Sequence, residues 1–124
     1  MNDIVFRCPL AALEPGECHD FAVDGIPLFV VRTESGAHCY LNQCPHRSVQ
    51  LNWRPNKFLD INREYIQCTT HGALFRIENG ECISGPCVGD QLDSVPLKIE
   101  SGEMRLYRCD LPGPDQIVQI KPTQ

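Results

Sequence analysis

Two short stretches, CPHRS at residues 44–48 and CTTHGALF at residues 68–75, each combine a cysteine with a histidine. One residue separates Cys44 from His46, and two residues separate Cys68 from His71. A single pair could not hold a metal firmly, but the two pairs together offer two thiolates and two imidazoles, which are good ligands for transition metals. The sequence therefore predicts one metal centre that uses both pairs.

The rest of the chain is typical of an all-β protein. Its 10 prolines and 9 glycines interrupt it every few residues, and no helix of ordinary length is predicted. Segments rich in β-branched and aromatic residues predict strands at Ile4–Arg7, Cys18–Val23, Leu28–Thr33, Ala37–Leu41, Tyr65–Cys68, Leu74–Glu78, Val95–Glu100 and Met104–Arg108. Turns are expected at Glu34–Gly36, Glu78–Gly80 and Ser101–Gly102.

The length and charge of the chain limit what it can do. Its 124 residues suit a single domain, and the longest apolar run, at 26–31, is far shorter than a membrane span. The first residues show no signal-peptide pattern, so we expect a soluble, cytoplasmic protein without a membrane partner. The net charge of −5 disfavours nucleic-acid binding. Residues 43–76 nevertheless contain five basic and two acidic side chains, in contrast to the acidic remainder.

Six further cysteines lie outside the two pairs. In a chain with a secretory signal, eight cysteines would indicate disulfides, but reduced thiols are expected in the cytoplasm. We expect Cys8, Cys18, Cys39 and Cys109 to be small buried hydrophobic residues. Cys82 and Cys87 flank a Gly-Pro segment, and Cys87 is expected to pack against the metal centre.

Two histidines and two aromatic residues lie outside the predicted ligand pairs. His19 and His38 have no ligand-like neighbours and are interpreted as ordinary strand or surface histidines. Trp53 and Phe58 are expected to anchor the irregular loop 52–63, which joins the two Cys/His pairs.

Zinc is one candidate for the centre. Zinc sites with two cysteines and two histidines usually open with a pair of cysteines and close with a pair of histidines, whereas each pair here is mixed. Both pairs are expected at the turns of β-hairpins, so that two loop tips approach one site. A binuclear centre, in which one metal takes the cysteines and the other takes the histidines, fits this pattern better.

The pattern C-x-H followed by C-x2-H-G resembles that of the Rieske proteins, which hold a [2Fe–2S] cluster with two cysteines on one iron and two histidines on the other. Gly72 follows His71 as in that family, and Ser84-Gly85-Pro86-Cys87 is similar to its third, cluster-covering loop. The resemblance implies that Cys44 and Cys68 bind the inner iron, and His46 and His71 the outer one.

The resemblance also implies the fold. We expect an antiparallel β-sandwich or barrel base with a small cluster-binding subdomain, made of two loop-tip hairpins and the Gly-Pro loop. The subdomain is expected at about 43–88, the base at about 1–42 and 89–112, and a C-terminal tail at 113–124.

Residues around the predicted cluster indicate its potential. High-potential members of the family have a disulfide between the ligand loops, where this chain has Val49 and Thr70. They also have a Ser and a Tyr that donate hydrogen bonds to the cluster, where this chain has Ala73 and Phe75. Arg47 adds positive charge, but solvent screens it. A potential near the low end of the Rieske range, about −150 to +300 mV, is therefore expected.

The most direct interpretation of these features is a soluble one-electron carrier, without catalytic activity of its own. The resemblance implies a flavin-dependent reductase as donor, an oxygenase or similar acceptor, and a monomer. An oxygenase's mononuclear iron needs two histidines and a carboxylate, yet two of the four histidines here already belong to the cluster pattern. Two alternatives stay open: a small subunit of a larger redox enzyme of the nitrite reductase type, and a zinc-stabilised interaction module.

Overall fold

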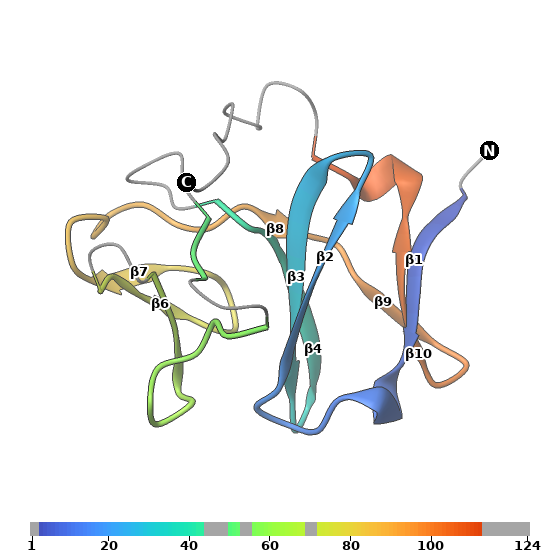
Figure 1. Cartoon of the computed structure of the whole chain (residues 1–124), viewed down its shortest axis with the longest axis horizontal. Coiled ribbons are helices and arrows are strands. Elements are labelled where there is room, and N and C mark those ends of the chain that lie inside the picture. Colours follow the sequence, from blue (N-terminus) through green and yellow to red (C-terminus); the bar gives the residue numbers. More distant parts are fainter. Residues whose placement is uncertain (1–2, 44–49, 53–55, 69–71, 113–124) are drawn as a thin grey trace.

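The chain folds into three antiparallel β-sheets, seen in a computed structural model that describes residues 3–43, 50–52, 56–68 and 72–112 (Figure 1). The first sheet has the order β1-β10-β9, the second β2-β3-β4-β8 and the third β5-β6-β7. The strands are β1 Ile4–Pro9, β2 Cys18–Val23, β3 Ile26–Thr33, β4 Gly36–Leu41, β5 Tyr65–Gln67, β6 Leu74–Arg76, β7 Cys82–Ser84, β8 Ser94–Val95, β9 Lys98–Glu100 and β10 Glu103–Tyr107. Two short 3-10 helices, η1 Leu10–Ala12 and η2 Arg108–Asp110, follow β1 and β10.

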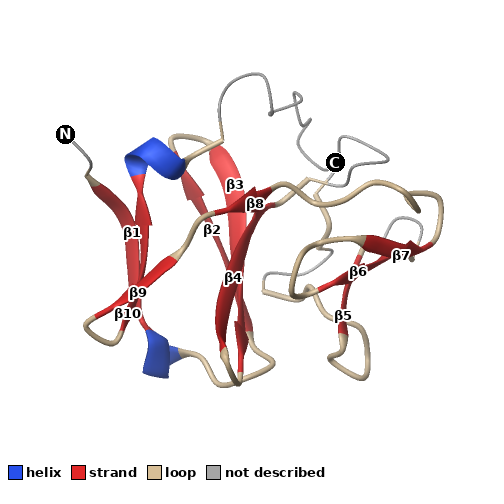
Figure 2. Cartoon of the chain, turned by 180° about the vertical axis from the view of Figure 1, so that it is seen from behind, coloured by secondary structure: helices blue, strands red, loops and turns tan. Residues whose placement is uncertain are grey.

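The sheet β2-β3-β4-β8 lies between the other two and is buried on both faces (Figure 2). Its central strand β3 explains this arrangement, because Leu28, Phe29, Val30 and Val31 are all fully buried. Side chains alternate between the faces of a strand. A continuous apolar run is therefore stable only where protein covers the sheet on both sides.

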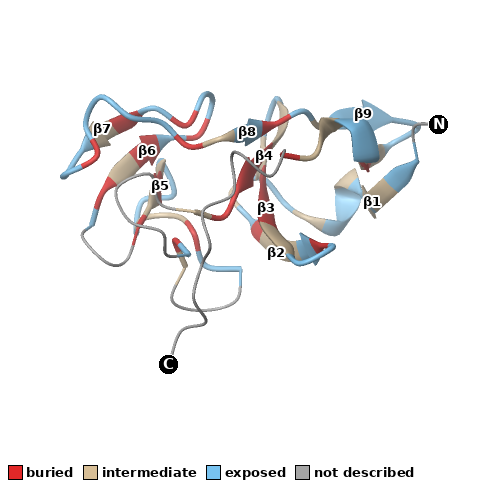
Figure 3. Cartoon of the chain, turned by 90° about the horizontal axis from the view of Figure 1, so that it is seen from above, coloured by how far each residue is buried: buried red, intermediate tan, exposed pale blue. Residues whose placement is uncertain are grey.

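Each face of this central sheet belongs to a different hydrophobic core. Leu28 and Val30 pack with Met104 and Leu106 of β10 in the core shared with the first sheet. Phe29 and Val31 face the other way, in a core that also contains residues of the third sheet. These two layers of packing hold the third sheet on one side of the molecule and β1-β10-β9 on the other (Figure 3).

Two contacts fasten the third sheet and its loops to the central sheet. The Tyr40 hydroxyl on β4 donates a buried hydrogen bond of 2.5 Å to the carbonyl oxygen of Ile77, which follows β6. The rings of Phe29 and Phe58 stack with centroids 4.0 Å apart and an angle of 6° between their planes. Stacked aromatic pairs of this kind stabilise a core beyond the area they bury.

The expected all-β class is confirmed, and among the described residues the sheets form no closed barrel. The expected turn at Ser101–Gly102 is also present, with φ of 51° and 75°, as a tight turn between β9 and β10 requires. Asp24–Gly25, with φ of 52° and 80°, forms a similar turn between β2 and β3 that the sequence prediction missed.

Seven of the eight strand predictions were wrong in their bounds, most of them by one or two residues at an end. The expected strand at Val95–Glu100 is split into β8 and β9, which belong to different sheets, because Pro96 and Leu97 carry the chain from one sheet to the next. The strands expected at Tyr65–Cys68 and Leu74–Glu78 end at Gln67 and Arg76. Strand β7 at Cys82–Ser84 was not predicted, since only three residues pair before the Gly-Pro segment.

The described part of the chain contains no helix that is both long and apolar enough to cross a membrane.

Replacing Tyr40 by phenylalanine should lower the free energy of unfolding by about 1–3 kcal/mol, because the buried Ile77 carbonyl loses its donor. Urea denaturation measures this change. Tyr107→Phe is the matched control, because the Tyr107 hydroxyl bonds to Glu100 on the surface. Equal effects of the two substitutions would contradict the fastening role of Tyr40.

Candidate metal centre

The turn that contains the second Cys/His pair is closed at its base by backbone hydrogen bonds. The Cys68 amide donates to the Ala73 carbonyl at 2.9 Å, and the Gly72 amide donates to the Cys68 carbonyl at 2.8 Å. Gly72 has a φ of +69°, which side chains other than glycine rarely adopt. Strands β5 and β6 pair on either side, so this pair lies at the expected hairpin turn.

The Gly-Pro segment lies directly against this turn. A Cβ atom on Gly85 would lie 2.9 Å from the Cα of Ala73, which is closer than real Cβ atoms approach, and 3.1 Å from the Cβ of Ala73. The segment then turns back through hydrogen bonds from the Asp90 amide to the Cys87 carbonyl, at 2.8 Å, and from the Val88 amide to the Gly85 carbonyl, at 3.4 Å. Cys87 is fully buried, while Pro86 and Val88 on either side are exposed.

The surroundings of Cys68 are apolar. Cys68 is fully buried and belongs to the core that contains Leu51, Phe58, Phe75 and Cys87. A buried thiolate in such a core requires a cation or strong donors to compensate its charge. The cysteine of an iron–sulfur site meets this requirement, so the described part of the centre fits a buried cluster ligand. Ala73 and Phe75 are also fully buried, and neither side chain carries a hydrogen-bond donor.

Most of the predicted ligands lie outside the described residues. These are Cys44, His46 and His71, together with the predicted neighbours Arg47, Val49, Thr70 and the loop residue Trp53. Within the described ranges, no three His, Cys, Asp or Glu side chains come together as a metal site.

The first Cys/His pair was also expected at a hairpin turn, but it lies outside the described residues. It lies on the connection from β4, whose sheet neighbours are β3 and β8, to the segment that pairs with β5 through the bridge between Leu59 and Ile66. Strand β8, from much later in the chain, lies beside β4 in this sheet.

A polar network beside the first pair was not predicted. The Asn42 amide oxygen accepts a hydrogen bond from the Leu51 backbone amide at 2.8 Å, and its nitrogen donates to the Asn52 side-chain oxygen at 2.9 Å. The Asn52 nitrogen in turn donates to Asp20 at 3.0 Å. Asp20 also accepts from the Asn56 backbone amide at 3.2 Å, while its own backbone amide donates to the Asn56 side chain at 2.8 Å. The only signal for this network in the sequence is the concentration of asparagines around the loop. Hydrophobic periodicity, from which the strands were predicted, does not reveal such a network.

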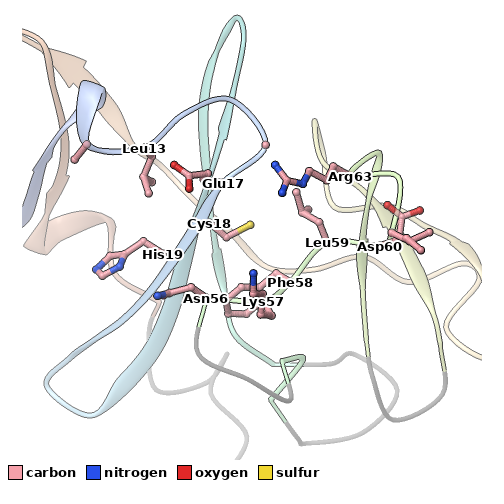
Figure 4. A pocket seen from close by; sticks show the side chains of 13 residues that line it. Leu13, Glu17, Cys18, His19, Asn56, Lys57, Phe58, Leu59, Asp60 and Arg63 are labelled. Atoms are coloured by element: carbon pink, nitrogen blue, oxygen red, sulfur yellow. The ribbon is translucent and has the colours of Figure 1, made fainter.

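A groove of about 570 Å³ lies between β2 and the loop 56–63, but its residues do not form a second reactive site (Figure 4). Its charged side chains are of both signs, with Glu17 and Asp60 against Lys57 and Arg63. Cys18 also lines it, but burial raises the pKa of this thiol to about 12, even though a hydrogen bond from the Phe58 backbone acts in the opposite direction. The thiol is therefore protonated at neutral pH and a poor nucleophile.

The remaining cysteines confirm the predictions only in part. Cys18 and Cys39 are buried as expected, Cys8 is half-buried, and the prediction for Cys109 was wrong, because it is exposed at η2 beyond the last strand. The Cys82 thiol lies 3.3 Å from the Ser84 carbonyl oxygen, to which it donates a hydrogen bond.

The aromatic anchor and the histidines can also be placed. Phe58 is buried and stacked on Phe29, so its role as a loop anchor is confirmed. His19 is half-buried beside Phe21 and Phe6, whose rings stack 3.8 Å apart, and His38 is half-buried on β4. Neither histidine is part of a described metal-binding group.

Comparison with known proteins gives a family match across most of the chain. The Rieske [2Fe-2S] domain model matches residues 3–100. The ferredoxin component of the alkene monooxygenase system of Xanthobacter autotrophicus strain Py2 is 32% identical over 105 residues, which is 85% of this chain and 81% of that protein.

Solved structures show the same fold. The ferredoxin of carbazole 1,9a-dioxygenase from Nocardioides aromaticivorans IC177 matches with a TM-score of 0.67 and 24% identity, over 82% of this chain and 94% of that one. A chain in the complex of reduced oxygenase and oxidized ferredoxin in carbazole 1,9a-dioxygenase matches with a TM-score of 0.63 and 23% identity. The match covers 78% of this chain and 94% of that one. At these identities the likeness shows the fold alone.

Replacing Gly85 by alanine should destabilise the protein by more than about 2 kcal/mol. Backbone strain at a φ of +97° costs about 1–2 kcal/mol, and overpacking against Ala73 adds about 1–3 kcal/mol. Urea denaturation gives the loss of stability.

Gly89→Ala is the matched control for this substitution. Gly89 has a similar φ of +101°, but a Cβ there would meet nothing within 4 Å, so only the strain applies. If Gly89→Ala cost as much as Gly85→Ala, the close approach to Ala73 would have no energetic role.

The stability of the protein should fall as the pH rises from about 9 to about 12. Burial raises the pKa of the Cys39 thiol from its ordinary value of 9.0 to about 12, so the unfolded chain releases this proton at lower pH than the native protein does. The stabilisation is complete below about pH 9 and is lost as the pH approaches 12. Denaturation midpoints measured across this range report the slope.

The Cys39→Ala variant should show a smaller loss across the same range. Some slope should persist, because burial also raises the pKa of Cys18 and of Tyr40. An unchanged slope in Cys39→Ala would show that the Cys39 thiol does not contribute to the pH dependence.

Proposed function

Because the chain belongs to the Rieske [2Fe-2S] domain family, we propose that it is a one-electron carrier whose cluster is held by Cys44, His46, Cys68 and His71. One observation carries the proposal beyond family membership. Cys68 is fully buried in a turn closed by backbone hydrogen bonds, and the Gly85 segment lies in contact with the same turn at Ala73. This is the arrangement that a loop-held cluster with a covering third loop requires.

The four proposed ligands divide into two kinds. Cys44 and Cys68 would bind the inner iron, and His46 and His71 the outer iron that faces solvent. The bound cluster supplies the uptake and release of a single electron. With two thiolate ligands the oxidised centre is neutral, so a small core can hold it without a large desolvation cost.

The protein surface around this site bears on electron transfer. Pro86 and Val88 are exposed on either side of the buried Cys87, so the covering loop presents small apolar groups to a partner. The positive balance of residues 43–76, in an otherwise acidic chain, would favour a partner with an acidic docking surface.

The relatives indicate what the partners are. One relative is the ferredoxin component of an alkene monooxygenase system, and another structure shows a ferredoxin in complex with an oxygenase. We infer that this chain receives electrons from a reductase, of the flavin-dependent kind, and delivers them to an oxygenase. In this account the chain is an electron-transfer component, and catalysis belongs to its acceptor.

The division of the chain and its location follow the same proposal. The cluster-binding subdomain would span about 43–88, the base about 1–42 and 89–112, and the tail 113–124. The packing supports a separate cluster-binding part, because Cys68 and the third sheet pack on one face of the central sheet, while β10 packs on the other face. Buried thiols such as Cys18 and Cys39 are suited to the reducing cytoplasm, where we place the protein.

The proposal predicts a Rieske-type electron paramagnetic resonance signal that appears only at low potential. Ala73 and Phe75 are buried next to the ligand turn and offer no side-chain donors, so nothing at these positions favours the reduced cluster. A potentiometric titration should therefore give a midpoint near the low end of the range of about −150 to +300 mV. A midpoint above about +100 mV would contradict this account of the cluster's surroundings.

Substituting Phe75 by tyrosine provides a directed variant of this experiment. A hydroxyl at this position should raise the midpoint, because an added donor stabilises the reduced, more negative cluster. Phe21→Tyr, on β2 where the central sheet faces Phe6 of β1, should leave the midpoint unchanged. A colourless protein that contains zinc would instead favour the interaction module.

A further inference from the structure

Among the buried residues that the structure describes, Asn42 alone is a polar residue, and only 3% of its surface is exposed. Burying an amide is unfavourable unless its hydrogen bonds are formed. Both ends of the Asn42 side chain are in fact paired, the oxygen with the Leu51 backbone amide and the nitrogen with Asn52. A position kept polar inside an apolar core calls for an explanation.

The location of Asn42 in the chain supplies this explanation. Strand β4 ends at Leu41, and the Asn42 backbone amide makes one more hydrogen bond, of 2.9 Å, to the carbonyl of Pro27 in β3. Its side chain then reaches forward to Leu51 and Asn52. Asn42 thus joins the residues that precede and follow the segment 43–50, which contains both Cys44 and His46.

Asp20 acts in a similar way on the next part of the loop. It accepts hydrogen bonds from the Asn52 side chain and the Asn56 backbone, the residues that flank 53–55. Asp20 lies on β2 and is paired with Phe29 of β3, so both connections lead back to the central sheet. The polar network of Asp20, Asn42, Asn52 and Asn56 therefore fixes the chain on both sides of the first ligand pair to a rigid support.

We propose that Asn42 is the positioning residue of the first ligand loop, holding the two ends of the segment with Cys44 and His46 at a fixed separation on the central sheet. This inference rests on the proposed ligand assignment. Ligands held by a preorganised shell lose less entropy when they bind a metal and release it more slowly. Without Asn42, the segment would keep its ligands but lose the closure at its base.

Rates of cluster loss test the proposal. The variants Asn42→Ala and Tyr40→Phe each remove a buried hydrogen bond that joins the central sheet to a later segment, but only Asn42 closes the first ligand loop. We expect Asn42→Ala to lose its visible absorption to a chelator about tenfold faster than Tyr40→Phe, which corresponds to about 1.4 kcal/mol. Asn62→Ala, at an exposed position of the loop, should behave as the wild type.

The electron paramagnetic resonance signal of the reduced protein gives a readout that a general loss of stability would not change. In Asn42→Ala this signal should broaden or shift, because the ligand loop samples more than one arrangement, and in Tyr40→Phe it should not. Equal rates of cluster loss and identical signals in the two variants would overturn the proposal.

A second pair of variants keeps the test decisive if Asn42→Ala does not fold. Asp20→Asn keeps an oxygen that can accept both hydrogen bonds, whereas Asp20→Ala removes it. We expect cluster loss to be several-fold faster in Asp20→Ala and unchanged in Asp20→Asn. If Asp20→Ala retained the cluster as firmly as the wild type, the network would have no positioning role.

The same measurements separate this proposal from the assignment on which it rests. A wild-type protein that holds no iron–sulfur cluster would overturn the proposed function and, with it, the role of Asn42. A loaded wild type whose Asn42→Ala variant keeps a tightly bound, unaltered cluster would overturn the positioning role alone.

Discussion

The burial of strand β3 on both faces is the constraint on which the rest of the structure depends. Leu28 and Val30 require a sheet on one side, and Phe29 and Val31 require a second layer on the other. The first sheet covers the face that carries Leu28 and Val30. The other side is covered by the small third sheet together with Phe58, so the packing of the central strand determines where the Cys68 turn lies.

The candidate centre is built from contacts that all lead back to this central sheet. The ring stack of Phe29 and Phe58, the Tyr40 hydroxyl bond and the hydrogen bonds of Asn42 connect it to three successive parts of the later chain. On the far side of the turn, the close approach of Gly85 to Ala73 adds the covering segment. The central sheet thus holds a site made of short loops, although it contributes no proposed ligand itself. Electron transfer requires ligands held in such a fixed geometry.

The sequence allowed the all-β class, the family and the second ligand turn to be predicted, because these depend on local patterns. The Cys/His spacing and the glycine after His71 are local signals, and β2 was predicted with its exact bounds. The split between β8 and β9, the place of β8 beside β4 and the polar network of Asn42 depend on residues far apart in the chain. No periodicity encodes such contacts, and an asparagine has the same local preferences whether it is buried or exposed.

Quantifying iron and acid-labile sulfide in the purified chain tests the central claim most directly, with Cys68→Ala and Cys82→Ala compared side by side. Both cysteines are buried in the same core, but only Cys68 is a proposed ligand. The account predicts about two irons and two sulfides per chain in the wild type and in Cys82→Ala, and loss of both in Cys68→Ala. Zinc in place of iron, or a full cluster in Cys68→Ala, would contradict it.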